Sequence, residues 1–70
     1  MTWHKVTLHP KTSINHRIIV WNYIGPLRQW CDHNLSSHGI LWKNDPYNNW
    51  FDFYFAQPQD AVMFRLVHSI

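Results

Sequence analysis

The sequence predicts a small α+β domain in which an antiparallel sheet is covered on one face by two helices. Three observations lead to this class: short runs of alternating or aromatic residues, two later segments with helical spacing of apolar residues, and turn-forming residues between the runs. The 70 residues suffice for one domain, 1–70. Because 17% of the residues are aromatic, large rings can offset the small size of the core.

The first expected element is a strand over residues 3–9. In the run WHKVTLH, Val6 and Leu8 fall on one side of an extended chain and Lys5 falls on the other. Pro10 and the polar residues after it then form a turn.

Residues 16–24, HRIIVWNYI, fit two structures. Their β-branched and aromatic side chains favour a strand, whereas Ser13 could cap a helix in which Ile18 and Trp21 share a face. We favour the strand, and two element orders remain open, ββαββα and βαββα.

The first helix is expected to begin at Pro26, because Gly25 ends the preceding segment and proline suits the first helical position. The apolar residues that follow have the spacing of one helical stripe: Leu27, Trp30, Cys31 and Leu35. Gly39, in the run SSHG, suits a left-handed position that terminates the helix.

A hairpin is expected next, because the turn-forming residues NDPY join two strand-like runs, 40–43 and 48–56. Alternation in the second run places three phenylalanines on the face that the helices cover: Phe51, Phe53 and Phe55. The opposite, open face then carries a half-polar row: Trp50, Asp52 and Tyr54.

The second helix is expected from Pro58, a residue suited to the first turn, with Asp60 close to the positive N-terminal end. Its apolar side consists of Ala61, Phe64 and either Leu66 or Val67.

The segment FYFAQPQDAVMFRL, residues 53–66, resembles the third strand and second helix of RNA-recognition-motif domains. That family has the ferredoxin-like split βαβ fold, so the resemblance implies this fold and an open sheet face that binds a partner. The chain departs from the family at Asp52, where the family has a stacking ring. A fourth strand would have to come from VHSI, residues 67–70.

The same segment also looks like short accessory proteins of bacteriophages, which end in an aromatic strand followed by an Asp-Ala-x-x-Phe-x-Leu helix. The matching residues here are Asp60, Ala61, Phe64 and Leu66. This resemblance implies a small viral protein in the host cytoplasm that inhibits, recruits or helps to build a host or virion protein.

The charge of the chain and the pattern of its apolar residues limit the class of partner further. Six Lys and Arg against four Asp give a net charge of +2, and the basic residues are scattered rather than clustered. No run approaches the roughly 20 apolar residues of a membrane span, and the N-terminus lacks a secretory pattern. The lone Cys31 cannot form a disulfide within the chain and is expected to be a buried hydrophobe. We therefore expect a cytoplasmic protein without a membrane partner.

The sequence argues against catalysis and cofactor binding. The four Asp lie in unlike contexts, and there is no nucleophile elbow, phosphate loop or nucleotide fingerprint. His33 and His38 lack the spacing of two metal ligands on one helix. We expect a non-enzymatic protein without a metal or a cofactor.

The first functional hypothesis is a protein-interaction module. Five Trp cannot easily all be interior in so small a domain, and exposed Trp and Tyr beside Arg are typical of contact surfaces. The expected surface residues are Trp42, Trp50, Tyr54 and Arg65. An unpaired edge strand would also permit a homodimer.

The second hypothesis is a module that binds single-stranded nucleic acid on the open sheet face. Trp50 and Tyr54 would stack on bases. The residues expected to contact phosphates are Lys5, Arg17 and Lys43.

Overall fold

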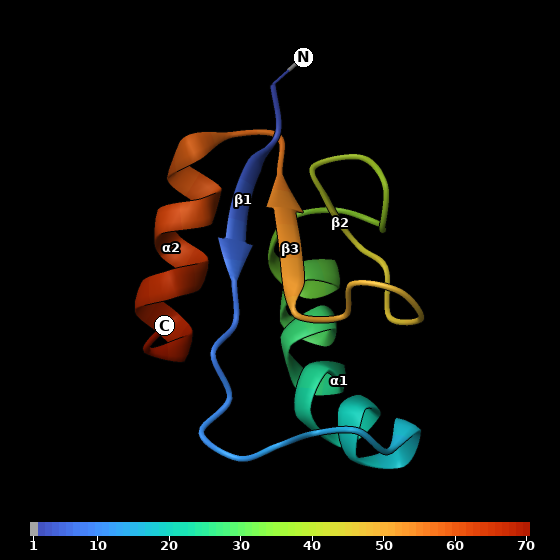
Figure 1. Cartoon of the computed structure of the whole chain (residues 1–70). Coiled ribbons are helices and arrows are strands. Elements are labelled where there is room, and N and C mark those ends of the chain that lie inside the picture. Colours follow the sequence, from blue (N-terminus) through green and yellow to red (C-terminus); the bar gives the residue numbers. More distant parts are fainter. Residues whose placement is uncertain (1) are drawn as a thin grey trace.

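The computed structural model describes residues 2–70, which form a small antiparallel sheet and two helices in the order βαββα. The strands are β1 (His4–Thr7), β2 (Trp42–Asn44) and β3 (Asp52–Phe55), and the helices are α1 (Arg17–Asn34) and α2 (Pro58–His68). β3 lies in the centre and pairs antiparallel with β1 and with β2 (Figure 1). The predicted α+β class is confirmed, and of the two predicted element orders the one that begins with two strands is wrong.

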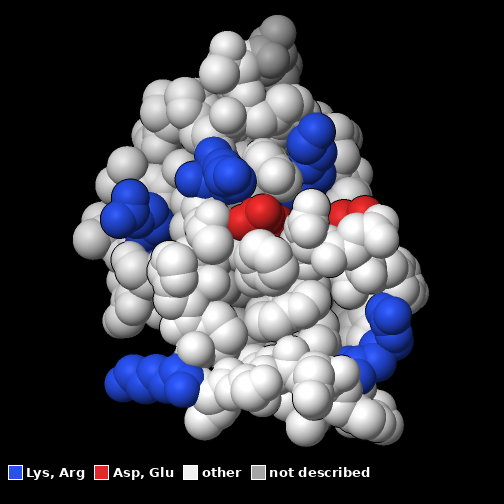
Figure 2. Space-filling model, in the orientation of Figure 1, with Lys and Arg blue, Asp and Glu red and all other residues white. Residues whose placement is uncertain are grey.

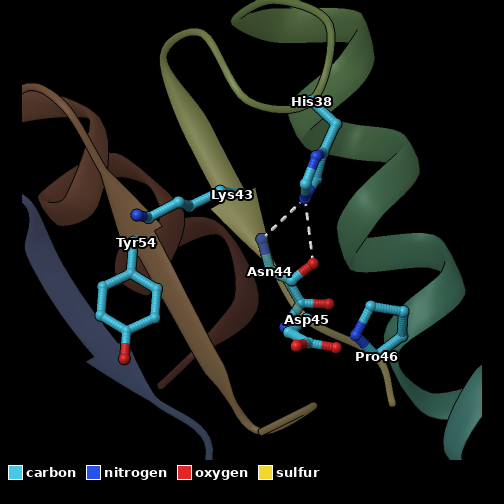
Figure 3. A pocket seen from close by; sticks show the side chains of 6 residues that line it. All are labelled: His38, Lys43, Asn44, Asp45, Pro46 and Tyr54. Carbon is cyan, nitrogen blue, oxygen red and sulfur yellow. Dashed lines mark hydrogen bonds between the residues drawn. The ribbon is translucent and has the colours of Figure 1, made fainter. Parts of the chain in front are cut away.

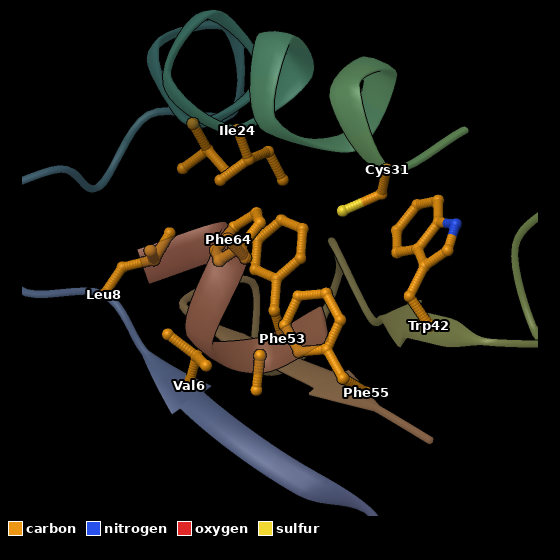
Figure 4. Close-up of a cluster of buried hydrophobic side chains, with 10 residues drawn as sticks. Val6, Leu8, Ile24, Cys31, Trp42, Phe53, Phe55 and Phe64 are labelled. Carbon is orange, nitrogen blue, oxygen red and sulfur yellow. The ribbon is translucent and has the colours of Figure 1, made fainter. Parts of the chain in front are cut away.

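Both helices pack on the face of the sheet that carries Phe53 and Phe55 (Figure 4). The ring of Phe64, from α2, lies with its centroid 4.9 Å from that of Phe53 and 5.0 Å from that of Phe55. Ile24 and Cys31 reach the same cluster from α1 and are fully buried. The core between the sheet and the two helices is therefore centred on aromatic rings, as the aromatic content predicts, with aliphatic side chains around them.

Residues 17–24 belong to the first half of α1, so the strand predicted over residues 16–24 is wrong. His16 is the N-cap residue, and its ring Nδ1 accepts a hydrogen bond from the amide of Ile18 (3.3 Å). Val20 and Ile24 face the core, and this burial outweighs the weak preference of β-branched residues for strands. Ile18 is 65% exposed, so it does not belong to the buried face.

Gly25 and Pro26 lie inside α1 and do not end the preceding segment, contrary to the prediction. Proline lacks the N–H that would bond to the carbonyl of Asn22, four residues earlier. Asn22 and Pro26 are both exposed, so water can bond to this carbonyl instead. The residues that hold the helix on the core continue across the proline at i, i+4, i+7, i+11 and i+15: Val20, Ile24, Leu27, Cys31 and Leu35.

β3 is shorter than the predicted strand 48–56, and this moves Trp50 and Phe51 into the turn that precedes it. Phe51 is 37% exposed and lies outside the core, so its predicted burial is wrong. Trp50 packs against the edge of the core instead of lying on the open face. Phe53 and Phe55 are fully buried, as predicted.

α2 begins at Pro58 and buries Ala61 and Phe64, as predicted. Its outward side is also apolar, with four exposed residues: Val62, Met63, Leu66 and Val67. Leu66 is 76% exposed, so its predicted place on the buried side is wrong, as is that of Val67. Residues 67–70 end the helix and do not form a fourth strand.

Cys31 is a buried hydrophobe, as predicted. Its side chain is fully buried, and this burial raises the pKa of the thiol to about 12. Within residues 2–70, neither helix is both long and apolar enough to cross a bilayer.

His68 lies at the edge of the core. Its ring centroid is 4.7 Å from that of Phe64 and 5.4 Å from that of Trp30. Its Nε2 is buried and has no hydrogen-bond partner in the part of the chain that the structure describes. Burial therefore lowers the pKa of His68 from its usual value.

Replacing Phe64 by alanine is expected to cost about 3 to 5 kcal/mol of unfolding free energy, because the ring fills the space between the sheet and α2. Leu66→Ala, on the exposed side of the same helix, should change it by no more than about 0.5 kcal/mol. Urea unfolding of the two variants measures this difference, and equal losses would mean that α2 packs with its other face.

Acidification is expected to destabilise the fold through His68. Burial lowers the pKa of His68 in the folded chain. Below about pH 6.5 the His68 ring is therefore protonated to a greater extent in the unfolded chain than in the folded chain. The unfolding free energy should therefore fall as the pH drops through this window, and fall less in His68→Phe. Urea unfolding at about pH 7.5 and about pH 5.5 tests this. Equal falls in the two proteins would contradict it.

Candidate functional site

Asn44, at the end of β2, joins four parts of the molecule through one buried side chain. Its Nδ2 donates to the carbonyls of Trp50 (2.8 Å) and Asp52 (2.9 Å), which fixes the turn and the start of β3. Its Oδ1 and its carbonyl both accept from Nη1 of Arg28 on α1, at 2.6 and 2.9 Å. Because every polar atom of this side chain has a partner, Asn44 can be buried without penalty and ties α1 to the hairpin.

Arg28 is held by more than these bonds. Its guanidinium lies 5.6 Å from the ring centroid of Trp21 and 5.3 Å from that of Trp42. Burial lowers the pKa of Arg28, and the carboxylate of Asp32, one helical turn away, opposes this shift. Arg28 is thus a structural cation that fixes the position of α1.

The turn after β2 is built around Asp45, as the NDPY pattern predicts. Its carboxylate accepts from the amides of Tyr47 (3.0 Å) and Asn48 (3.2 Å), and from Nδ2 of Asn48 (2.8 Å). The side-chain bond from Asn48 is the main cause that lowers the pKa of Asp45. These bonds leave Tyr47 at the tip of a rigid turn.

Aromatic rings gather where this turn meets the first half of α1. We call this region the turn–helix surface; it comprises Arg17, Trp21, Tyr23, Tyr47, Trp50 and Phe51. Tyr47 is 65% exposed, with the guanidinium of Arg17 at 4.8 Å from its ring centroid and the Trp21 ring edge-on at 6.3 Å. The rings are therefore held in place by one another while part of their surface stays in solvent.

Trp50 continues this surface toward α1. Its ring makes edge-to-face contacts with Tyr23 (6.0 Å) and Phe51 (5.5 Å). A cavity of about 230 Å³ opens between Trp50, Tyr47 and Arg17. Large rings of this kind around a hollow are the usual anchors of protein contacts.

The open face of the sheet carries a second, smaller aromatic group. The ammonium of Lys43 lies 4.5 Å from the ring centroid of Trp3 and 5.6 Å from that of Tyr54. Asp52 interrupts the row, and its carboxylate accepts from the hydroxyl of Thr7 (2.8 Å). Figure 2 shows Lys and Arg side chains spread over one side of the molecule with acidic side chains between them, not gathered into one patch.

A hollow of about 640 Å³ lies beside β2 and is lined by His38, Lys43, Asn44, Asp45, Pro46 and Tyr54 (Figure 3). The Nε2 of His38 is 2.9 Å from both the amide nitrogen and the carbonyl oxygen of Asn44, so this ring is hydrogen-bonded to the backbone of β2. Asp45 is likewise committed to its turn. Within residues 2–70, no group of three His, Cys, Asp or Glu lies close enough to hold a metal ion.

The structure separates the site residues that the sequence suggests. Trp42 is fully buried in the core, so its predicted place on the surface is wrong. Trp50 belongs to the turn–helix surface, Tyr54 to the open face, and Arg65 is exposed on α2 beside β1. Sequence reasoning missed Tyr47, although the turn residues before and after it are a signal that it is exposed.

The cations proposed for phosphate contacts are also divided. Lys5 and Lys43 lie on the open face, where both flank Tyr54 in the strand register. Arg17 lies on α1, against Tyr47.

The fold and the site together define a small α+β protein with a preorganised aromatic surface. No family model, curated protein or solved structure matches the chain.

Removing the side chain of Asn44 is expected to destabilise the protein by at least about 2 kcal/mol, because two buried carbonyls and Arg28 lose a partner at about 1 to 3 kcal/mol for each unsatisfied group. Thermal and urea unfolding of Asn44→Ala test this. The control is Asn48→Ala, whose amide is exposed. If both variants unfold at the same urea concentration, Asn44 is not the tie between α1 and the hairpin.

Proposed function

We propose that this chain is a small non-enzymatic protein-interaction module that binds a partner protein through its turn–helix surface. The observation that carries the proposal is the exposed ring of Tyr47, fixed between Arg17 and Trp21 on a hydrogen-bonded turn. Tyr, Trp and Arg are the residue types that contribute most to binding energy in protein interfaces.

Rigidity supports the proposal as much as composition does. A side chain that is already ordered loses little conformational entropy on binding, and flexible side chains lose about 0.5 to 1.5 kcal/mol each. The Asp45 bonds order the turn, and the Arg28–Asn44 bonds order α1 beside it. Ile18 and Ile19, both exposed on the same half of α1, extend the apolar area that a partner can cover.

The two resemblances in the sequence extend the proposal to the finer topology of the sheet and to the class of partner. We propose a ferredoxin-like sheet that lacks its last strand, because the strand order β1-β3-β2 is compatible with a split βαβ unit. The likeness of the Asp60–Leu66 helix to phage accessory proteins favours a host or virion protein as the partner. Inhibition of that partner is one form this binding can take.

Tyr47→Ala is expected to abolish capture of the partner and to leave the melting temperature of the protein close to that of wild type, because Tyr47 is mostly exposed. Tagged wild-type and variant proteins are incubated with a nuclease-treated bacterial lysate, and bound proteins are quantified by mass spectrometry. One protein near stoichiometric amounts should be retained by wild type and lost, at least about tenfold, with Tyr47→Ala.

The matched control for this experiment is Leu66→Ala, which removes an exposed apolar side chain from α2, away from the turn. It should retain the partner. A partner that binds the Tyr47→Ala protein as well as wild type, or that is lost with Leu66→Ala instead, would overturn the assignment of the surface.

Binding of single-stranded nucleic acid is the second candidate function, and the Lys43 ammonium beside Trp3 and Tyr54 favours it. It requires that a labelled oligonucleotide binds with an affinity that falls steeply with salt, and that Lys43→Gln weakens binding more than Lys11→Gln. Binding that is absent or insensitive to salt rules this function out.

A further inference from the structure

The outer edge of β1 carries unpaired backbone groups. The amide of Leu8 donates to the carbonyl of Phe51 (2.7 Å), so in this antiparallel register Val6 and Leu8 point their backbone groups toward β3. The N–H and C=O groups of Lys5 and Thr7 therefore point away from the sheet. Among residues 2–70, these four groups have no hydrogen-bond partner.

The opposite edge of the sheet, at β2, is closed by the protein itself. The carbonyl of Trp42 accepts from the amide of Gly39 (2.7 Å), which the positive φ of +96° at this glycine allows. The backbone of Asn44 is covered by His38 on its amide and by Arg28 on its carbonyl. Among residues 2–70, the amide of Trp42 is thus the one outward group of β2 without a partner, whereas all four outward groups of Lys5 and Thr7 on β1 stay open to another strand.

A groove of about 250 Å³ runs along this open edge, between β1 and the C-terminal part of α2. It is lined by Lys5, Val6, Thr7, His9, Arg65 and Ile70, and none of these side chains is acidic. Lys5 lies on the open face of the sheet, whereas Arg65 lies on the helix side. A strand laid in this groove therefore meets a cation on each of its two faces.

We propose that the β1 edge binds an extended, acidic segment of a partner protein, which adds to the sheet as a strand beside β1. The backbone groups of Lys5 and Thr7 bond to the segment, and Lys5 and Arg65 pair with carboxylates on its two faces. None of the residues that line this groove belongs to the turn–helix surface, so the inference goes beyond the proposed function and does not rest on it.

A second copy of this chain is the less suitable occupant of the edge. The first carboxylate in the sequence is Asp32, so β1 and the segments that flank it bring only cations and histidines. Pairing β1 with β1 of another copy would place two sets of Lys5, His9 and Arg65 side by side. Like charges at such a short distance oppose pairing, whereas an acidic strand relieves them.

The proposal can be tested with a library of ten-residue random segments displayed on yeast and sorted for binding to the folded, labelled protein. Selected segments are expected to alternate β-branched residues with Asp or Glu and to contain few Lys or Arg. The best of them is then synthesised as a free peptide and titrated by fluorescence anisotropy against variants of the protein.

Lys5→Pro is the first variant. It removes the outward N–H of residue 5 without removing a hydrogen bond between β1 and β3. It should weaken peptide binding by at least about tenfold, whereas Lys5→Thr, which keeps the N–H, should lose only about threefold. Arg65→Glu should weaken binding at least about tenfold. Lys11→Glu, the control with the same change in net charge, should leave it within about twofold.

A modified peptide keeps the test independent of variants that fail to fold. Methylating alternate backbone nitrogens of the peptide on the edge-facing side removes its donors and should abolish binding to the wild-type protein. The same methylation on the other side should be tolerated. Tyr47→Ala should bind the peptide like wild type, which separates this edge from the turn–helix surface.

Four results would overturn the proposal: no segment enriched by sorting, enriched segments without an excess of acidic residues, binding that survives Lys5→Pro, or binding that survives edge-side methylation. Sedimentation analysis completes the test. A dimer of the wild-type protein that Lys5→Pro dissociates would mean that a second copy occupies the edge.

Discussion

The arrangement of this molecule depends on the buried amide of Asn44. A three-residue strand such as β2 makes few ladder bonds of its own, and it stays in place because its last residue is bonded to α1, to the turn and to β3 together. The same side chain fixes where Trp50 leaves the turn, and hence where the aromatic rings on α1 meet those of the turn. The fully bonded side chain of Asn44, set in a mainly hydrophobic interior, thus specifies a unique packing, whereas apolar side chains alone can slide against each other.

The two edges of the sheet differ in how many of their outward backbone groups have a hydrogen-bond partner within the protein. At β2 a histidine, an arginine and a glycine bond to three of the four outward backbone groups of Trp42 and Asn44, whereas β1 is left without such protection. Natural sheets that avoid association block both of their edges. A sheet that is blocked at one edge alone can add a strand only at the other. Lys5 and Arg65 lie along this open edge, and none of the side chains that line its groove is acidic.

Sequence reasoning predicted the elements whose signals are local. The alternation in β1, the turn around Asp45, the burial of Phe53 and Phe55 and the start of α2 at Pro58 all follow from neighbouring residues. The errors arose where tertiary contacts outweigh local preference. The sequence favours a helix start at Pro26, although the apolar stripe from Val20 to Leu35 continues across this proline at helical spacing and is visible in the sequence. The burial of Trp42 and the network around Asn44 depend on residues distant in the sequence, so no local pattern indicates them.

The apolar outward side of α2 has a consequence for how the chain folds. The helix carries Ala61 and Phe64 on one side and Val62, Met63 and Leu66 on the other, so either side can dock on a nascent sheet. The native orientation prevails because only Phe64 can stack on Phe53 and Phe55. Docking through the outward side of α2 would leave Phe64 in solvent and would leave Phe53 and Phe55 without their partner ring. The three rings therefore select one rotation of α2 about its axis from several that its apolar sides would allow.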